Sequence, residues 1–212
     1  MWILTAALAV TVALPAAASA GEPKIDPAKG TFPVSFTAAG GYMKLVNASP
    51  IITCDSYKAS GKFTSATTGS IETTFETCGI TVLGNRYPCN TPGQSLGTIT
   101  FSESTFHLVY LTSGKTVPGV LITPPANGLF SNTSCVEEIR GTGYMGLLST
   151  PSCGKATASF NFAYELNVSG MQKYRQVTGT GTFYNLQYNG SETGLLSTNT
   201  WTLEQEATLT CV

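Results

Sequence analysis

The chain has 212 residues, and only 11% of them are charged, against roughly a quarter in typical globular domains. The formal net charge is −1 and no Lys/Arg cluster is present, which excludes the electrostatic footprint of a nucleic-acid-binding protein. An apolar content of 42% with so little net charge also excludes a disordered chain.

The N-terminus has the pattern of a secretory signal peptide. An apolar run from Trp2 to Leu14 ends at Pro15, and small residues follow up to Ala18-Ser19-Ala20. This run is too short to span a hydrocarbon layer of about 30 Å, and no second long apolar run exists in the sequence. We expect a signal peptide over residues 1–20, cleavage near Ala20, a secreted or cell-envelope location, and no membrane span in the mature chain.

After an expected short linker over residues 21–29, strict alternation of apolar and polar residues predicts strands. The longest such run is SFNFAYELNV at residues 159–168, and TFPVSFT at 31–37 and GTITFSE at 97–103 follow the same period. The run FHLVYL at 106–111 is apolar on both faces and predicts a central strand. These patterns place one face of each strand in a core.

Turn signals rich in Gly, Pro, Asn and Ser separate these runs, and no segment keeps a helical apolar period. The fold class we predict is all-β: an antiparallel β-sandwich or barrel-like structure of about ten or more short strands. Residues 30–212 are expected to form a single domain. The sequence leaves open whether two halves, about 30–135 and 136–212, pack together as separate units.

The last run, WTLEQEATLTC at residues 201–211, predicts the orientation of the C-terminal cysteine. Trp201, Leu203, Ala207 and Leu209 share one parity with Cys211, and Gln205 is the only polar member of that set. The Cys211 side chain should therefore point toward the core, where a disulfide would hold a strand that otherwise frays.

Six cysteines in an exported chain predict three disulfides. We expect Cys54–Cys135, Cys78–Cys89 and Cys153–Cys211, with Cys54–Cys78 nearly as plausible, because spacing alone does not decide the connectivity. A zinc site is not expected, because the sequence has no CxxC motif and only one histidine. No cofactor is expected either.

Several short segments together resemble a set of exported, β-rich, cysteine-containing proteins common in actinobacteria. The segments are AAGGYMKL, IITC, FETCG, YPCNTPGQSLGTI and NGLFSNTSC. Cys54, Cys78, Cys89 and Cys135 match the four cysteines of that set, from about Phe36 to Gly141. One departure is the Thr before Cys78, where the set more often has Gly. The resemblance implies a fold and an extracellular address, and no activity.

No catalytic constellation emerges from the titratable residues. His107 is the only histidine and lies within an apolar strand, so a strand histidine is the simplest interpretation. Glu204 and Glu206 share a strand face about 7 Å apart, close to the spacing of a glycosidase pair, but that face is opposite the core. Glu137 and Glu138 form an adjacent pair in a loop.

The leading prediction is a non-enzymatic structural or binding module, whose partner is unknown: a cell-wall polymer, a glycan or an envelope protein. The alternatives are a polysaccharide-active hydrolase that uses Glu residues and a glycan-binding module. Aromatic rings near turns are the candidates for stacking on sugars: Tyr57, Tyr144, Tyr174, Tyr188 and Trp201. The strand parity of Trp201 favours a core position for that ring.

Overall fold

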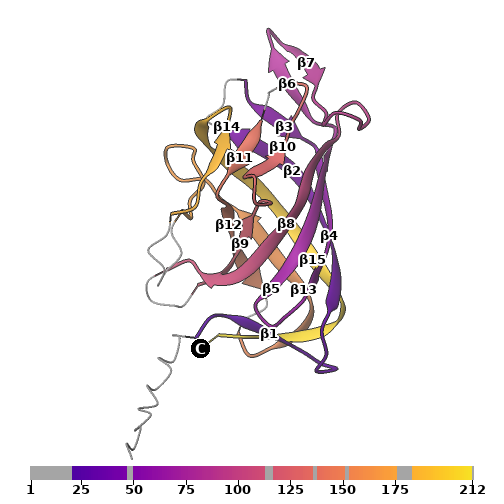
Figure 1. The fold of residues 1–212 in the computed structure, drawn as a ribbon, viewed down its shortest axis with the longest axis vertical. Coiled ribbons are helices and arrows are strands. Elements are labelled where there is room, and N and C mark those ends of the chain that lie inside the picture. Colours follow the sequence, from indigo (N-terminus) through magenta and orange to yellow (C-terminus); the bar gives the residue numbers. More distant parts are fainter. Residues whose placement is uncertain are drawn as a thin grey trace, which may run out of the picture.

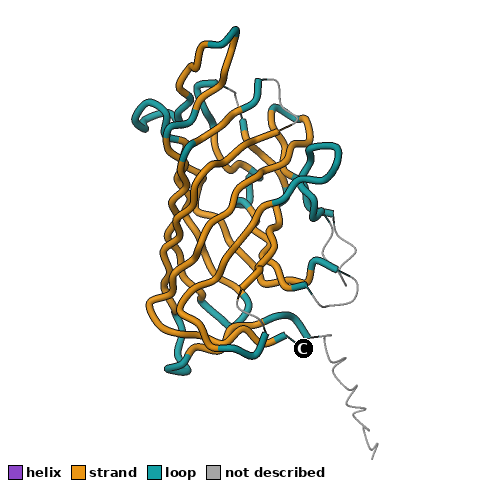
Figure 2. The backbone as a smooth tube through the Cα atoms, turned by 180° about the vertical axis from the view of Figure 1, so that it is seen from behind, coloured by secondary structure: helices purple, strands orange, loops and turns teal. Residues whose placement is uncertain are grey.

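The computed structural model describes residues 21–46, 50–112, 117–135, 138–150, 153–175 and 183–211. All of the regular structure in this part of the chain is β-strand, which confirms the all-β prediction (Figures 1 and 2). The strands are β1 (Lys24–Pro27), β2 (Val34–Val46), β3 (Ile52–Cys54), β4 (Ser56–Phe63), β5 (Thr68–Glu76), β6 (Gly79–Val82), β7 (Asn85–Pro88), β8 (Ile99–Tyr110), β9 (Pro118–Thr123), β10 (Leu129–Ser131), β11 (Ile139–Gly141), β12 (Tyr144–Thr150), β13 (Ala156–Tyr164), β14 (Leu186–Tyr188) and β15 (Ser191–Thr210).

Eight of these strands form a closed antiparallel barrel. They follow one another around the wall in chain order, β2, β4, β5, β8, β9, β12, β13 and β15, and β15 then pairs with β2 to close the sheet. Strands from both halves of the chain therefore belong to one wall. Closure removes the free edges of the barrel strands, which an open sheet would have to protect.

The two ends of the barrel differ in what connects their strands. Because successive strands alternate in direction, the connections that contain β3, β6–β7, β10–β11 and β14 all fall at one end, the upper end in Figure 1. Among the described residues, the connections at the opposite, lower end contain no extra strand, and β1 flanks this end. Loops at one end of a rigid scaffold are the usual carriers of function, so the upper end is the place to search.

Aromatic side chains fill the barrel interior, as the alternating sequence pattern predicts. Phe36 stacks on Trp201 with ring centroids 4.2 Å apart, and Trp201 also stacks on Phe162 at 5.3 Å. Phe160, Phe162 and Tyr164 of β13 are all buried, as are Ile99 and Phe101 of β8. Each strand thus contributes one apolar face to a packed interior.

The upper mouth of the barrel is covered by a small sheet of β10, β11 and β14, which joins the wall through the first residues of β15. Phe130 of β10 lies over Phe101 and Tyr144, with ring centroids 5.4 and 5.1 Å away. The hydroxyl of Tyr188 on β14 donates to the Pro50 carbonyl at 2.8 Å. Phe130 and Tyr188 are both buried.

Two expected boundaries are wrong. Residues 21–29 contain β1, which pairs with the end of β15 from Lys24↔Thr210 to Pro27↔Ala207, where we expected a linker. The long run at 159–168 ends as a strand at Tyr164, because the Asn167 side chain accepts hydrogen bonds from the Ser169 and Met171 backbone and makes a turn. Val168 is consequently exposed. The predicted signal peptide, residues 1–20, lies outside the described residues.

The structure pairs Cys54 with Cys78, Cys89 with Cys135, and Cys153 with Cys211. The expected Cys153–Cys211 pair is present, whereas Cys54–Cys135 and Cys78–Cys89 are not. The reason is sheet register. Strands β3 and β6 pair with Thr53 opposite Gly79, so Cys54 lies beside Cys78, with the two Cα atoms 3.9 Å apart. Three disulfides indicate an oxidising, extracellular type of environment.

Candidate functional site

The catalytic candidates suggested by the sequence do not come together. His107 lies on the outer face of β8, where its Nε2 is 2.9 Å from a carboxylate oxygen of Glu22. Glu204 and Glu206 are both exposed on β15, and Glu138 pairs with Arg140. Glu137 lies outside the described residues. Within the described part of the chain, no Asp, Glu, Lys, Arg or His is buried.

Four of the five rings considered for sugar stacking are core residues. Tyr57, Tyr144, Tyr188 and Trp201 are buried, and only Tyr174 is partly exposed. Among the described residues, no three His, Cys, Asp or Glu side chains are grouped so that they could hold a metal ion. The same residues contain no helix that is long and apolar enough to cross a membrane.

A feature that the sequence analysis did not single out is the hairpin of β6 and β7, which projects from the upper end beyond the barrel wall (Figure 1). Its turn consists of Leu83 and Gly84, with φ angles of 50° and 82°. Both values belong to the two-residue turn that suits the twist of a hairpin, in which the first position usually holds Asn, Asp or Gly. Leucine is unusual there, and Leu83 is 97% exposed.

The hairpin is anchored to the barrel by one arginine. Arg86 of β7 donates to the Thr53 carbonyl at 3.2 Å and to the Thr77 carbonyl, and its guanidinium forms an ion pair with Asp55 at 3.2 Å. The Arg86 side chain passes directly over Gly79, since a Cβ atom on Gly79 would lie 3.1 Å from its Cγ and Nε atoms. The missing side chain of Gly79 therefore makes room for this anchor.

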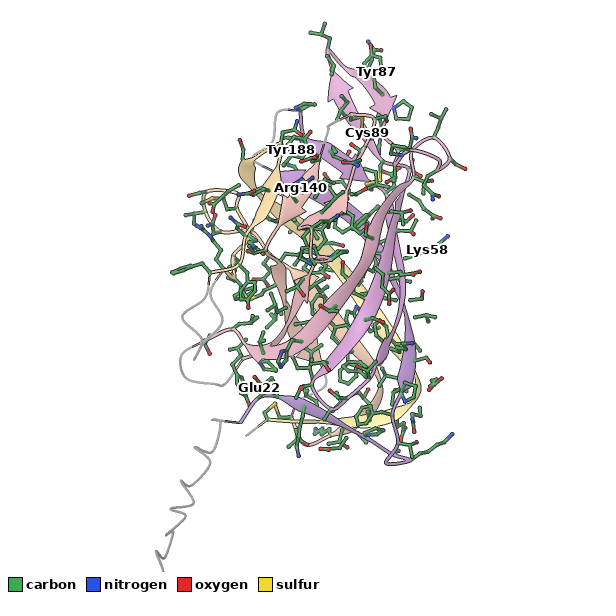
Figure 3. The ribbon with its side chains drawn as sticks, viewed as in Figure 1. Glu22, Lys58, Tyr87, Cys89, Arg140 and Tyr188 are labelled. Atoms are coloured by element: carbon green, nitrogen blue, oxygen red, sulfur yellow. A yellow bond between two sulfur atoms is a disulfide. The ribbon has the colours of Figure 1, made fainter. Side chains whose placement is uncertain are left out.

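The two disulfides at the upper end cross-link the residues that flank the hairpin, one on each side. Cys78 directly precedes β6 and is bonded to Cys54 of β3, while Cys89 directly follows β7 and is bonded to Cys135. The Cys89 amide also donates to the Cys78 carbonyl at 2.9 Å. Figure 3 shows Tyr87 on the projecting part, above Cys89. These cross-links present the hairpin in one orientation.

An open groove of about 770 Å³ lies on the outer face of β2, β3 and β6, beside the hairpin. We call it the hairpin groove, and it is lined by Tyr42, Lys44, Pro50, Ile51, Thr53, Thr81, Val82 and Leu83. Strand register explains the grouping, because Lys44 lies opposite Thr53, and Thr53 lies opposite Gly79 on β6. Alternate residues of three neighbouring strands thus form one surface.

Most of the exposed large apolar side chains in the described part of the chain lie in or beside the hairpin groove. Nine large apolar side chains are exposed in that part of the chain, and six of them belong to the groove, the hairpin or the adjacent loop: Tyr42, Ile51, Val82, Leu83, Tyr87 and Leu96. A seventh, Leu196, lies opposite Lys44 on β15. Scattered exposed apolar residues need no explanation, but a contiguous group marks an interaction site.

Lys44 supplies the only charge in the lining of the hairpin groove. Within the described residues it has no ion-pair partner, whereas Lys58, Arg86 and Arg140 each have one. The hydroxyls of Tyr42, Thr53 and Thr81 are the other polar side-chain groups of the lining. The groove therefore offers an apolar surface with a single unpaired cation.

A weak signal for this site was present in the sequence. The segment GITVLGNRYP consists of two short runs on either side of the turn residues Leu83 and Gly84. Leu83 is apolar and follows the apolar Val82, whereas polar residues are usual at such a turn. The sequence gives no comparable signal that Tyr42 and Ile51 are exposed, because their exposure depends on how β3 and β6 pair in the folded protein.

The fold and the site together define a disulfide-linked, up-and-down antiparallel β-barrel that presents an apolar hairpin at one end. No protein-family model matches the chain, and no match is found among curated proteins or solved structures.

Proposed function

We propose that this chain is a secreted or cell-envelope binding module that holds another extracellular protein through the hairpin groove. The single observation that carries the proposal is the concentration of exposed apolar side chains on a hairpin that two disulfides and Arg86 fix to the barrel. A site that is ordered before binding loses less conformational entropy when the partner docks.

The lining favours a protein partner over a polysaccharide. Ile51, Val82 and Leu83 are aliphatic, and an aliphatic side chain offers no flat face on which a sugar ring can stack. Lys44 is complementary to a carboxylate on the partner. The partner we propose therefore presents apolar side chains beside an acidic group.

The experiment is a pull-down from the culture medium and the cell envelope of the source organism with the oxidised, immobilised protein. Tyr42→Ser and Leu83→Asp are the test variants, and Val168→Asp is the matched control, because Val168 is an equally exposed apolar residue away from the groove. Proteins retained by the wild type are purified and tested again for direct binding to all four proteins.

We expect one partner that binds the wild type and Val168→Asp, and that binds both groove variants at least tenfold more weakly. Binding of that partner should also weaken with rising salt if Lys44 faces a carboxylate. Equal binding by all four proteins would place the contact elsewhere. Retention on purified cell-wall polymer alone, insensitive to Leu83, would favour the glycan-binding alternative and contradict a protein partner.

A further inference from the structure

Five side chains in the barrel interior bear polar atoms that have no hydrogen-bond partner among the described residues. These atoms are the hydroxyls of Tyr57, Tyr164 and Ser197, both amide atoms of Asn199 and the indole nitrogen of Trp201. All five residues are buried. A buried polar group without a partner is costly, and native proteins contain few of them, so a cluster of five requires a physical explanation.

These groups lie close together. Ser197, Asn199 and Trp201 occupy successive inward positions of β15, and Tyr164 of β13 lies opposite Ser197 in the register of the two strands. The Tyr57 hydroxyl is near Thr73, Tyr164 and Trp201, whose polar groups partly oppose the burial that raises the pKa of Tyr57. None of them reaches the Tyr57 hydroxyl in hydrogen-bond geometry. The cluster therefore surrounds a polar spot inside an aromatic barrel.

The occupant of this spot must be neutral and small. No charged side chain is buried among the described residues, so an ion here would lack a counter-charge and would bear the full penalty of desolvation. The cluster contains both hydrogen-bond donors and acceptors, because hydroxyl and amide groups can donate and accept, whereas the indole N–H only donates. Water matches such a set, because it both donates and accepts hydrogen bonds.

The strand pairing of the barrel wall is irregular beside the cluster. The pairing of β15 with β2 shifts register between Ser197 and Asn199, next to Gly40. A groove of about 400 Å³ on the outer wall reaches this point, and its lining includes Asn199 together with the polar residues Asn161, Thr198 and Thr200. The groove contains no charged side chain. It gives water a polar path to the position where Asn199 lies.

We propose that the barrel interior is a hydration site, in which two or three ordered water molecules, to order of magnitude, bridge Tyr57, Tyr164, Ser197, Asn199 and Trp201 and exchange with solvent at the register shift between β2 and β15. The site is independent of the hairpin groove. It explains why the interior keeps an asparagine whose amide atoms have no hydrogen-bond partner among the described residues.

The first test is a high-resolution crystal structure of the full chain. We expect water in hydrogen-bond distance of the Asn199 amide and the Trp201 indole nitrogen. In solution, the protein cleaved near Ala20 keeps Trp201 as its one tryptophan, and the indole N–H of Trp201 should show a magnetisation transfer peak to long-lived water. Rearranged side chains that pair with one another, or density for a molecule other than water, would overturn the proposal.

The second test uses Tyr57→Phe and Tyr164→Phe, which each remove one hydroxyl and leave the ring. If the hydroxyls bind water, both variants should unfold at lower denaturant concentration than the wild type. If the hydroxyls are dry and unpaired, their removal should raise that midpoint, which contradicts the proposal. Thr202→Val, on the outer face of the same strand and outside the groove lining, is the control and should leave the midpoint unchanged.

Discussion

Gly79 lies where the hairpin joins the barrel, and a methyl group has no room there. A Cβ atom at this position would lie 2.6 Å from the Tyr87 carbonyl oxygen and 3.1 Å from the Arg86 side chain. We expect Gly79→Ala to displace Arg86 from the Thr53 and Thr77 carbonyls and to lower the free energy of unfolding by about 1–3 kcal/mol. Urea denaturation measures the change.

Gly41 provides the matched control for this substitution. It also lies in a strand at the upper end, but a Cβ atom there would meet nothing within 4 Å. Gly41→Ala should therefore leave the urea midpoint almost unchanged. Equal effects of the two substitutions would show that the crowding at Gly79 is not the cause.

The buried tyrosines make stability depend on alkaline pH. Burial raises the pKa of Tyr57, Tyr144 and Tyr164 above the ordinary value near 10, whereas the unfolded chain keeps that ordinary value. Above pH 10 the folded state therefore binds more protons than the unfolded state. Stability should be fully present below pH 10 and should fall as the pH rises beyond it, by up to about 1.4 kcal/mol per pH unit for each tyrosine.

Urea denaturation at a series of pH values from 8 to 12 measures this dependence. Tyr144→Phe, which keeps the ring and removes the ionisable hydroxyl, should reduce the slope above pH 10. A urea midpoint that stays constant to pH 12 would mean that these hydroxyls ionise as easily in the folded protein as in the unfolded chain.

At the scale of single elements, the end of β15 depends on contacts with two strands and one disulfide. Ala207 and Leu209 are buried, and β1 and the start of β13 pair with this segment. The Cys153–Cys211 bond closes a loop with a sequence separation of 58, which in the chain-entropy model is worth about 4 kcal/mol. Replacing both cysteines by serine should lower the free energy of unfolding by an amount of this order.

Hydrogen exchange locates the loss. In the double Cys→Ser variant, the amides of residues 207–210 should exchange much faster, because a terminal strand without a cross-link frays. Amides of β4 and β5, in the middle of the wall, should keep their protection. Uniform loss of protection over the whole barrel would contradict local fraying.

The elements that the sequence predicted are those with a local signal. The inward faces of β2, β8, β13 and β15 follow from period-2 alternation over each run. Strand β1 has no such period in its four residues, KIDP, and is held by pairing with β15, by burial of Ile25 and by the hydrogen bond from the Ile25 amide to the Ala66 carbonyl. The disulfide Cys54–Cys78 likewise depends on β3 and β6 meeting, and non-local pairing leaves no trace in either segment.

The hairpin groove was missed for a related reason. Tyr42 and Ile51 belong to apolar runs that look like core strands, and only the three-dimensional arrangement shows their side chains on the outer face. Conversely, Tyr57, Tyr144 and Tyr188 are near turns in the sequence but lie in the interior or under the covering sheet. Exposure at a barrel end is a property of the assembled fold.

At the scale of the whole molecule, the barrel provides the stability of the fold, and the hairpin provides the proposed binding surface. The hairpin of β6 and β7 is not one of the eight wall strands, and its residues contribute little to the aromatic interior. Residues 81–86 can therefore be replaced by Asn-Gly, a pair that forms a tight hairpin turn between Ile80 and Tyr87, which face each other across the two strands. Cys78 and Cys89 remain in place in this variant.

The shortened variant should keep the barrel fold and lose about 1–3 kcal/mol of its free energy of unfolding, because it lacks the contacts of Arg86 with Asp55 and with the Thr53 and Thr77 carbonyls. The same variant should no longer retain the extracellular partner, because Val82 and Leu83 are gone. Calorimetry and the pull-down measure the two properties on one sample. Loss of the barrel fold would mean that the hairpin is part of the stable core, and full retention of the partner would remove the hairpin from the binding site.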